Sequence, residues 1–103
     1  MDLASVAHLS AIKGSAAILH FFDGFRTSHE IQKIELIDYE VLDKLLDRDA
    51  VKAFRERSLA PSHPKTIGTA QNPDVYFQGR EATNKHYEQI PEIVQYYMDK
   101  IGE

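Results

Sequence analysis

The feature that most constrains the fold is an apolar run followed at once by a polar loop. Residues 16–22 read AAILHFF and show almost no alternation between polar and apolar side chains. Such a run is typical of a strand covered on both faces, as in a parallel sheet with helices on each side. Asp23 and Gly24 end the run. The sequence therefore predicts a buried strand that delivers a polar loop at its carboxyl end.

Helical patterns surround this predicted strand. Residues 2–13 carry apolar side chains at helical spacing and stop before Gly14, which can take the left-handed conformation at a helix end. A second short strand is expected at residues 34–37. A helix capped by Asp38 follows it, and another begins near Asp49. The expected fold class is α/β, a partial parallel sheet flanked by helices.

The second half of the chain is predicted to be a linker followed by helices. Residues 60–73 contain three prolines and one glycine, so an extended linker is expected there. Too little chain lies on either side for two cores, so residues 1–103 are interpreted as a single segment. Helices are expected at residues 74–80 and from Asn84. Pro91 should kink the last helix or start it afresh.

Composition narrows the classes of function. Twelve basic residues are spread among 16 acidic ones, and a net charge of -4 argues against nucleic-acid binding. The chain has no cysteine, so it cannot supply the thiolates of an iron–sulfur cluster. No apolar run approaches a membrane span, and no signal peptide is recognised, so a soluble, cytoplasmic protein is expected. Helical periodicity directly after Met1 suggests a fragment.

The polar loop supplies the candidate site residues. They are Asp23, Arg26, Thr27, Ser28, His29 and Glu30, and they are expected to face an active site or an interface. Arg26 is the strongest single candidate, because a guanidinium suits a carboxylate or phosphate. The alternative is a structural ion-pair network of Arg26 with Asp23 and Glu30. A helical turn is expected at residues 27–30, with Thr27 or Ser28 as its cap.

The histidines indicate little chemistry. His20 lies inside the apolar run and is interpreted as a hydrogen-bonded core residue. Ser28, His29 and Glu30 are sequence neighbours, whereas the members of a catalytic triad converge from separated positions. A metal site built from His20, Asp23, His29 and Glu30 matches no spacing that specifies one. No catalytic residue and no metal ligand is assigned, and an independent enzyme using His29 is the weakest hypothesis.

Four long strings carry a family resemblance. They read HFFDGFRTSHEIQKIE (20–35), DAVKAFRERSL (49–59), GTAQNPDVYFQGREATN (68–84) and PEIVQYYMDKI (91–101). In this order, over essentially the whole chain, they resemble pyruvate:ferredoxin (flavodoxin) oxidoreductase, or pyruvate synthase. The resemblance places the chain in the C-terminal part of that enzyme's N-terminal domain. That domain is an α/β unit that binds the pyrimidine half of thiamine diphosphate.

The resemblance implies an enzyme that oxidatively decarboxylates pyruvate to acetyl-CoA in anaerobic metabolism. It implies thiamine diphosphate with magnesium, iron–sulfur clusters and coenzyme A as cofactors, and ferredoxin or flavodoxin as electron acceptor. In the family, the groups that bind the diphosphate, the clusters and coenzyme A lie outside the matched part. This chain alone is therefore expected to bind no cofactor.

Two functions from different classes follow. The first is a segment of this oxidoreductase that supplies scaffold and interface, is inactive alone and has the remaining domains as its partner. The second is a stand-alone, non-enzymatic interaction module that reuses the same piece of fold. A two-strand remnant would leave apolar faces uncovered. We therefore expect association with the rest of the enzyme, or self-association in isolation.

Overall fold

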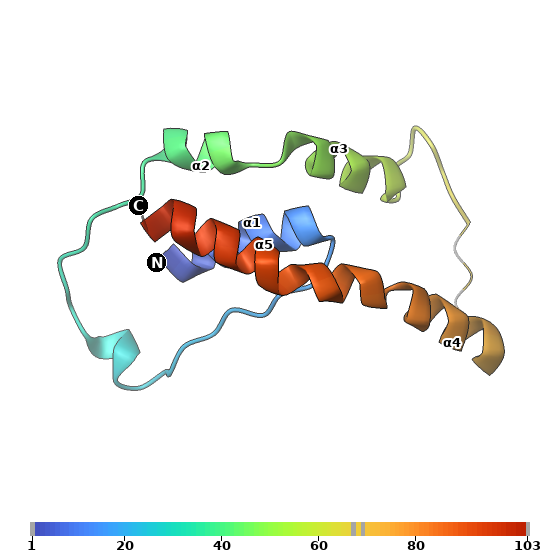
Figure 1. Cartoon of the computed structure of the whole chain (residues 1–103), viewed down its shortest axis with the longest axis horizontal. Helices are drawn as coiled ribbons and strands as arrows, with labels where there is room; N and C mark the ends of the chain where they lie inside the picture. Colours follow the sequence, from blue (N-terminus) through green and yellow to red (C-terminus); the bar gives the residue numbers. More distant parts are fainter. Residues whose placement is uncertain (1, 67, 69, 103) are drawn as a thin grey trace.

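The computed structural model describes residues 2–66, 68 and 70–102, and its regular structure is helical. The elements are α1 (Asp2–Gly14), the 3-10 turn η1 (Thr27–His29), α2 (Tyr39–Leu45), α3 (Arg48–Arg57), α4 (Pro73–Ala82) and α5 (Asn84–Gly102). Figure 1 shows α1 beside α5, with α2 and α3 following one another along the same side of this pair. Among the described residues, none of the helices is long and apolar enough to cross a membrane.

The predicted α/β fold with a parallel sheet is wrong. Within the described ranges there is no strand, and the only bridge is an isolated antiparallel pair between Ala60 and His63. Residues 16–22 and 34–37, both expected as strands, have no regular structure. A strand needs neighbours that pair its backbone and cover its faces. The described residues offer neither here.

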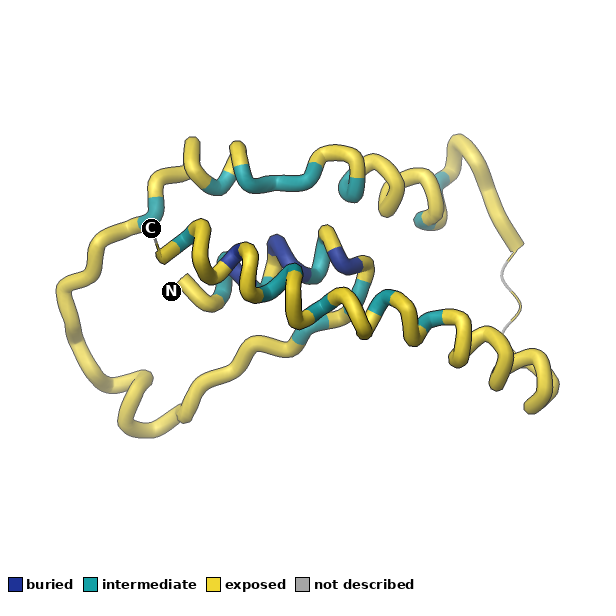
Figure 2. Tube along the Cα trace, viewed as in Figure 1, coloured by how far each residue is buried: buried dark blue, intermediate teal, exposed yellow. Residues whose placement is uncertain are grey.

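Instead, residues 16–37 form a long excursion that leaves α1 and returns to α2, which we call the arm. Figure 1 shows it looping away from the helices, and Figure 2 shows it exposed over almost its whole length. Its apolar side chains face outward, with Leu19 83% and Phe21 80% exposed. The run that predicted a buried strand is thus largely exposed, with its two phenylalanines and Leu19 open to solvent.

The core lies where α1 packs on α5. In the described part of the chain, the buried hydrophobic side chains are those of Val6, Leu9 and Tyr97. Partly buried side chains from α2, its end and α5 pack around them: Leu42, Leu45, Leu46, Ile93, Val94 and Ile101. The Tyr97 hydroxyl donates a hydrogen bond to the Leu45 carbonyl oxygen at 3.3 Å. Burial, with a smaller contribution from nearby Asp47, raises the pKa of Tyr97.

Aspartates cap α2 and α3, the first two helices after the arm. Asp38 accepts a hydrogen bond from the Glu40 backbone N–H at 2.9 Å, which confirms the predicted cap of α2. Asp47 accepts one from the Ala50 backbone N–H, also at 2.9 Å. Because Asp47 is the cap, α3 begins at Arg48, slightly earlier than predicted. Lys13 lies 3.4 Å from Asp47 and links α1 to α3.

Two predictions about helix ends need correction. Ser15, not Gly14, has the left-handed backbone, with φ 51°. Gly14 is instead the buried last residue of α1. Of the two outcomes predicted for Pro91, a fresh helix start is wrong, because Pro91 lies inside α5. A kink there stays a prediction. Pro91 has no backbone N–H to donate to the Tyr87 carbonyl oxygen, and both residues are exposed.

The predicted linker at residues 60–73 corresponds to most of the segment between α3 and α4. Two of its residues, 67 and 69, lie outside the described ones. Ala60 to His63 forms a tight turn closed by a backbone hydrogen bond of 3.1 Å. Pro73 already belongs to α4. The role of this segment as a linker within one domain stays a prediction.

Gly14 lies against Ile90 and Ile93 of α5, and enlarging it should separate the two helices. A Cβ at this position would overlap Ile90 Cδ1 and lie 3.5 Å from Ile93 Cδ1. We expect Gly14→Val to destabilise the fold by about 1–3 kcal/mol, because Ile90 alone cannot make room for two methyl groups. Gly79→Val in α4 is the control, since a Cβ there meets nothing within 4 Å. Urea denaturation followed by circular dichroism measures both; equal midpoints would contradict this packing.

Asp47 should make the helices acid-sensitive. The hydrogen bond from Ala50 is the main cause that holds the pKa of Asp47 below its ordinary value, with Lys13 contributing against the effect of burial. A lowered pKa stabilises the fold above about pH 3.9, the unfolded value, and this stabilisation is lost as pH falls through the folded value. Asn also caps helices but does not titrate. Asp47→Asn should therefore lose less helix on acidification; identical circular dichroism titrations would refute this.

Candidate functional site

The polar loop is closed on itself by local contacts. His29 Nδ1 lies 2.7 Å from the Phe25 carbonyl oxygen, and the two rings are 5.3 Å apart between centroids. The Ser28 hydroxyl donates to the Gly24 carbonyl and lies 3.1 Å from His29 Nδ1. The predicted helical turn is confirmed as η1. Its N-cap is Arg26, without a side-chain hydrogen bond, so the predicted Thr27 or Ser28 cap is wrong.

The charged residues of the loop do not join one another. None of the ion pairs between described residues involves Asp23, Arg26 or Glu30. The structural ion-pair network is therefore not formed, and within the described ranges Glu30 accepts only a long hydrogen bond, from Gln32 at 3.5 Å. Arg26 and Glu30 are both exposed. The loop is held by backbone and ring contacts, which leaves its charges open to other molecules.

The described residues support neither the core position of His20 nor the metal site weighed in the sequence. His20 is exposed, so its interpretation as a core residue is wrong, because the arm that carries it is uncovered. In the described part of the chain no three side chains of the metal-binding types come together. His20, Asp23, His29 and Glu30 are therefore not assembled as ligands.

A wide hollow lies between the arm and the start of α1. Its volume is about 610 Å³, and its lining residues are Asp2, Leu3, His20, Phe21, Phe22, Thr27 and Ser28. Thr27 and Ser28 are thus the candidate site residues that reach it. Phe22 remains 64% exposed within it. The hollow is therefore open to solvent and lined by apolar and polar side chains together.

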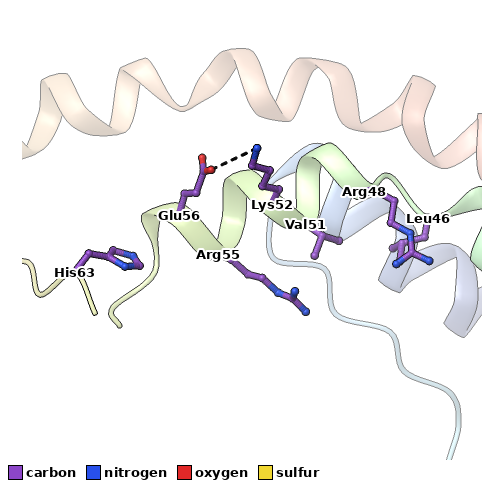
Figure 3. Close-up of a pocket in the computed structure, with 7 residues that line it drawn as sticks. All are labelled: Leu46, Arg48, Val51, Lys52, Arg55, Glu56 and His63. Atoms are coloured by element: carbon purple, nitrogen blue, oxygen red, sulfur yellow. Dashed lines mark ion pairs between the residues drawn. The ribbon is translucent and has the colours of Figure 1, made fainter. Parts of the chain in front are cut away.

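A second hollow, which the sequence interpretation missed, runs along α3. Its volume is about 380 Å³, and Leu46, Arg48, Val51, Lys52, Arg55, Glu56 and His63 line it; we call it the α3 groove. Figure 3 shows Arg48 and Arg55 extending from one side of α3, away from the Lys52–Glu56 ion pair. The sequence signal is the spacing of Arg48 and Arg55, which lie seven residues, about two helical turns, apart and so share one side of α3. His63 joins them through the turn after α3.

Comparison with known proteins gives a consistent result. Residues 1–99 match the family described as pyruvate flavodoxin/ferredoxin oxidoreductase, thiamine diphosphate-binding. The chain is similar to the pyruvate-flavodoxin oxidoreductases of Enterobacter agglomerans and Klebsiella pneumoniae, with 66% and 60% identity over 102 residues. It is 57% identical over 102 residues to the pyruvate:ferredoxin oxidoreductase of Moorella thermoacetica. Each alignment covers 99% of this chain but only 9% of the relative.

Proposed function

Because the chain belongs to the pyruvate flavodoxin/ferredoxin oxidoreductase family, we propose that it works as one segment of such an enzyme. The family resemblance seen in the sequence is confirmed by the match over residues 1–99. In this proposal the whole enzyme converts pyruvate oxidatively to acetyl-CoA and passes the electrons to flavodoxin or ferredoxin. The chain supplies scaffold and interface and has no activity alone.

The observation that carries the proposal is the exposed apolar arm. Seven large apolar side chains of the arm are at least half exposed: Leu19, Phe21, Phe22, Phe25, Ile31, Ile34 and Leu36. Soluble monomers rarely expose apolar side chains in such a contiguous set, and a set like this marks a surface that other polypeptide covers. The chain spans about a tenth of the length of its curated relatives. The remaining length supplies the cover.

The cofactors are proposed to bind outside this chain. Magnesium and the diphosphate it holds need oxygen ligands that converge, and no three carboxylate or imidazole groups converge in the described ranges. The described ranges thus offer no cluster of such side chains that would hold the metal by itself. Iron–sulfur clusters need thiolates, and the chain has no cysteine. We place all of these groups, and coenzyme A, in the rest of the enzyme.

The polar loop is proposed to face that remaining part, at an interface or on the active-site side. Its candidate residues are Asp23, Arg26, Thr27, Ser28, His29 and Glu30. Support comes from their position at the tip of the arm and from the exposure of Arg26 and Glu30, which form no ion pair with described residues. The cytoplasmic location expected from the sequence stays part of this proposal.

A chimera tests the proposal. The 102 residues of the Enterobacter agglomerans enzyme that align with this chain, 66% identical, would be replaced by it. We expect the chimera to reduce flavodoxin with pyruvate within a few-fold of the parent, because its covered surfaces are preserved. The isolated chain and an enzyme lacking these residues should be inactive. An active deletion enzyme, or activity in the isolated chain, would contradict the segment role.

Two serine substitutions in the chimera identify the covered surface. Phe22 is 64% exposed among other apolar side chains of the arm, whereas Phe54 is 59% exposed and stacks beneath Arg57 at 5.7 Å. Phe22→Ser should lower the yield of active enzyme about tenfold, because a Phe side chain buried in the enzyme is lost. Phe54→Ser is the matched control. Equal effects of the two would favour the stand-alone interaction module over an arm covered by the enzyme.

A further inference from the structure

Helix α4 is exposed along its whole length. Figure 2 shows all of α4 exposed, and Figure 1 shows it at the opposite end of the longest axis from η1 in the arm. Its large apolar side chains are open to solvent, with Val75 50%, Tyr76 57% and Phe77 64% exposed. Isolated helices shorter than about 12–15 residues are marginal in water. A helix of 10 residues such as α4 therefore needs packing that the described residues do not provide.

One side of α4 combines apolar side chains with a glycine. At about 100° per residue, four residues fall on this side, which we call the α4 face: Val75, Tyr76, Gly79 and Ala82. Acidic and amide side chains recur at helical spacing on the polar side: Asp74, Gln78 and Glu81. A Cβ placed on Gly79 would meet nothing within 4 Å. The α4 face thus has an open, shallow depression with apolar side chains around it.

Gly79 weakens the helix that carries it. Glycine is a poor helix former, because fixing its backbone costs more entropy than fixing that of any other residue. Nothing within the described chain calls for glycine here, since its φ is not positive and the space beside it is open. A glycine inside a helix is useful where another backbone approaches closely. The described residues supply no such neighbour, so we look for it in other polypeptide.

We propose that the α4 face docks a helix of the remaining oxidoreductase, with the crossing point at Gly79. This inference rests on the proposed function. The chain spans about a tenth of the length of its curated relatives, and the remaining length supplies the helix. Helices pack ridges into grooves, and the separation of their axes depends on the side chains at the contact. Gly79 permits a close crossing, and Val75 and Tyr76 supply the apolar area around it.

A size series at Gly79, measured in the isolated chain and in the chimera, tests the docking. In the isolated chain, urea midpoints should not fall in Gly79→Val and should rise in Gly79→Ala, because alanine is the best helix former. In the chimera the order should reverse. Gly79→Val should lower the yield of active enzyme about tenfold, and Gly79→Ala by less, because added methyl groups hold the two helices apart. Glu81→Val is the control, since it places the same side chain on the polar side of α4.

The outcomes separate this docking from the proposed function. An active chimera in which Gly79→Val has no effect, or no more effect than Glu81→Val, would overturn the docking and leave the segment role intact. An inactive unmodified chimera would overturn the segment role and the docked helix with it. A lower urea midpoint for Gly79→Val in the isolated chain would overturn the docking, because Gly79 would then be needed within the chain. So would an isolated chain that is dimeric by size-exclusion chromatography and becomes monomeric in Gly79→Val, because the α4 face would then bind a second copy.

Discussion

The packing of α1 against α5 holds this chain together. Val6 and Leu9 of α1 meet Tyr97 of α5, and the Tyr97 hydroxyl reaches the Leu45 carbonyl oxygen. Side-chain contacts then attach α3: Lys13 to Asp47 at 3.4 Å, and Arg57 to the Ser15 hydroxyl at 2.9 Å. These exposed or half-exposed polar contacts contribute little by themselves. They hold α3 only while α1 and α5 stay packed.

This core is small for the length of the chain. Besides its few buried hydrophobic side chains it contains Ser10, which is fully buried and whose hydroxyl has no hydrogen-bond partner in the described part of the molecule. Such a group costs about 1–3 kcal/mol. Stability of folded proteins is a small surplus over large opposing terms. A core of this size does not reach the arm, and the arm's large apolar side chains find no cover among the described residues.

The contrast between helices and arm explains what the sequence could predict. A helix satisfies its own backbone, so local signals such as the apolar spacing of residues 2–13 and the cap at Asp38 were sufficient. An apolar run such as residues 16–22 indicates only that cover is required, and neither a partner nor a pairing edge can be seen in it. The prediction that His20 lies in the core was wrong for the same reason. In the polar loop the helical turn was local and predictable, whereas the α3 groove depends on a turn that returns His63 to the helix.

The central proposal is that the rest of an oxidoreductase covers the arm. Amide hydrogen exchange tests this proposal most directly. Exchange of residues 16–37 would be measured in the isolated chain and in the chimera with the Enterobacter agglomerans enzyme. We predict fast, unprotected exchange in the isolated chain and strong protection in the chimera, since covered and ordered backbone exchanges slowly. Equally fast exchange in both would contradict the account, because the arm would then be uncovered in the enzyme as well.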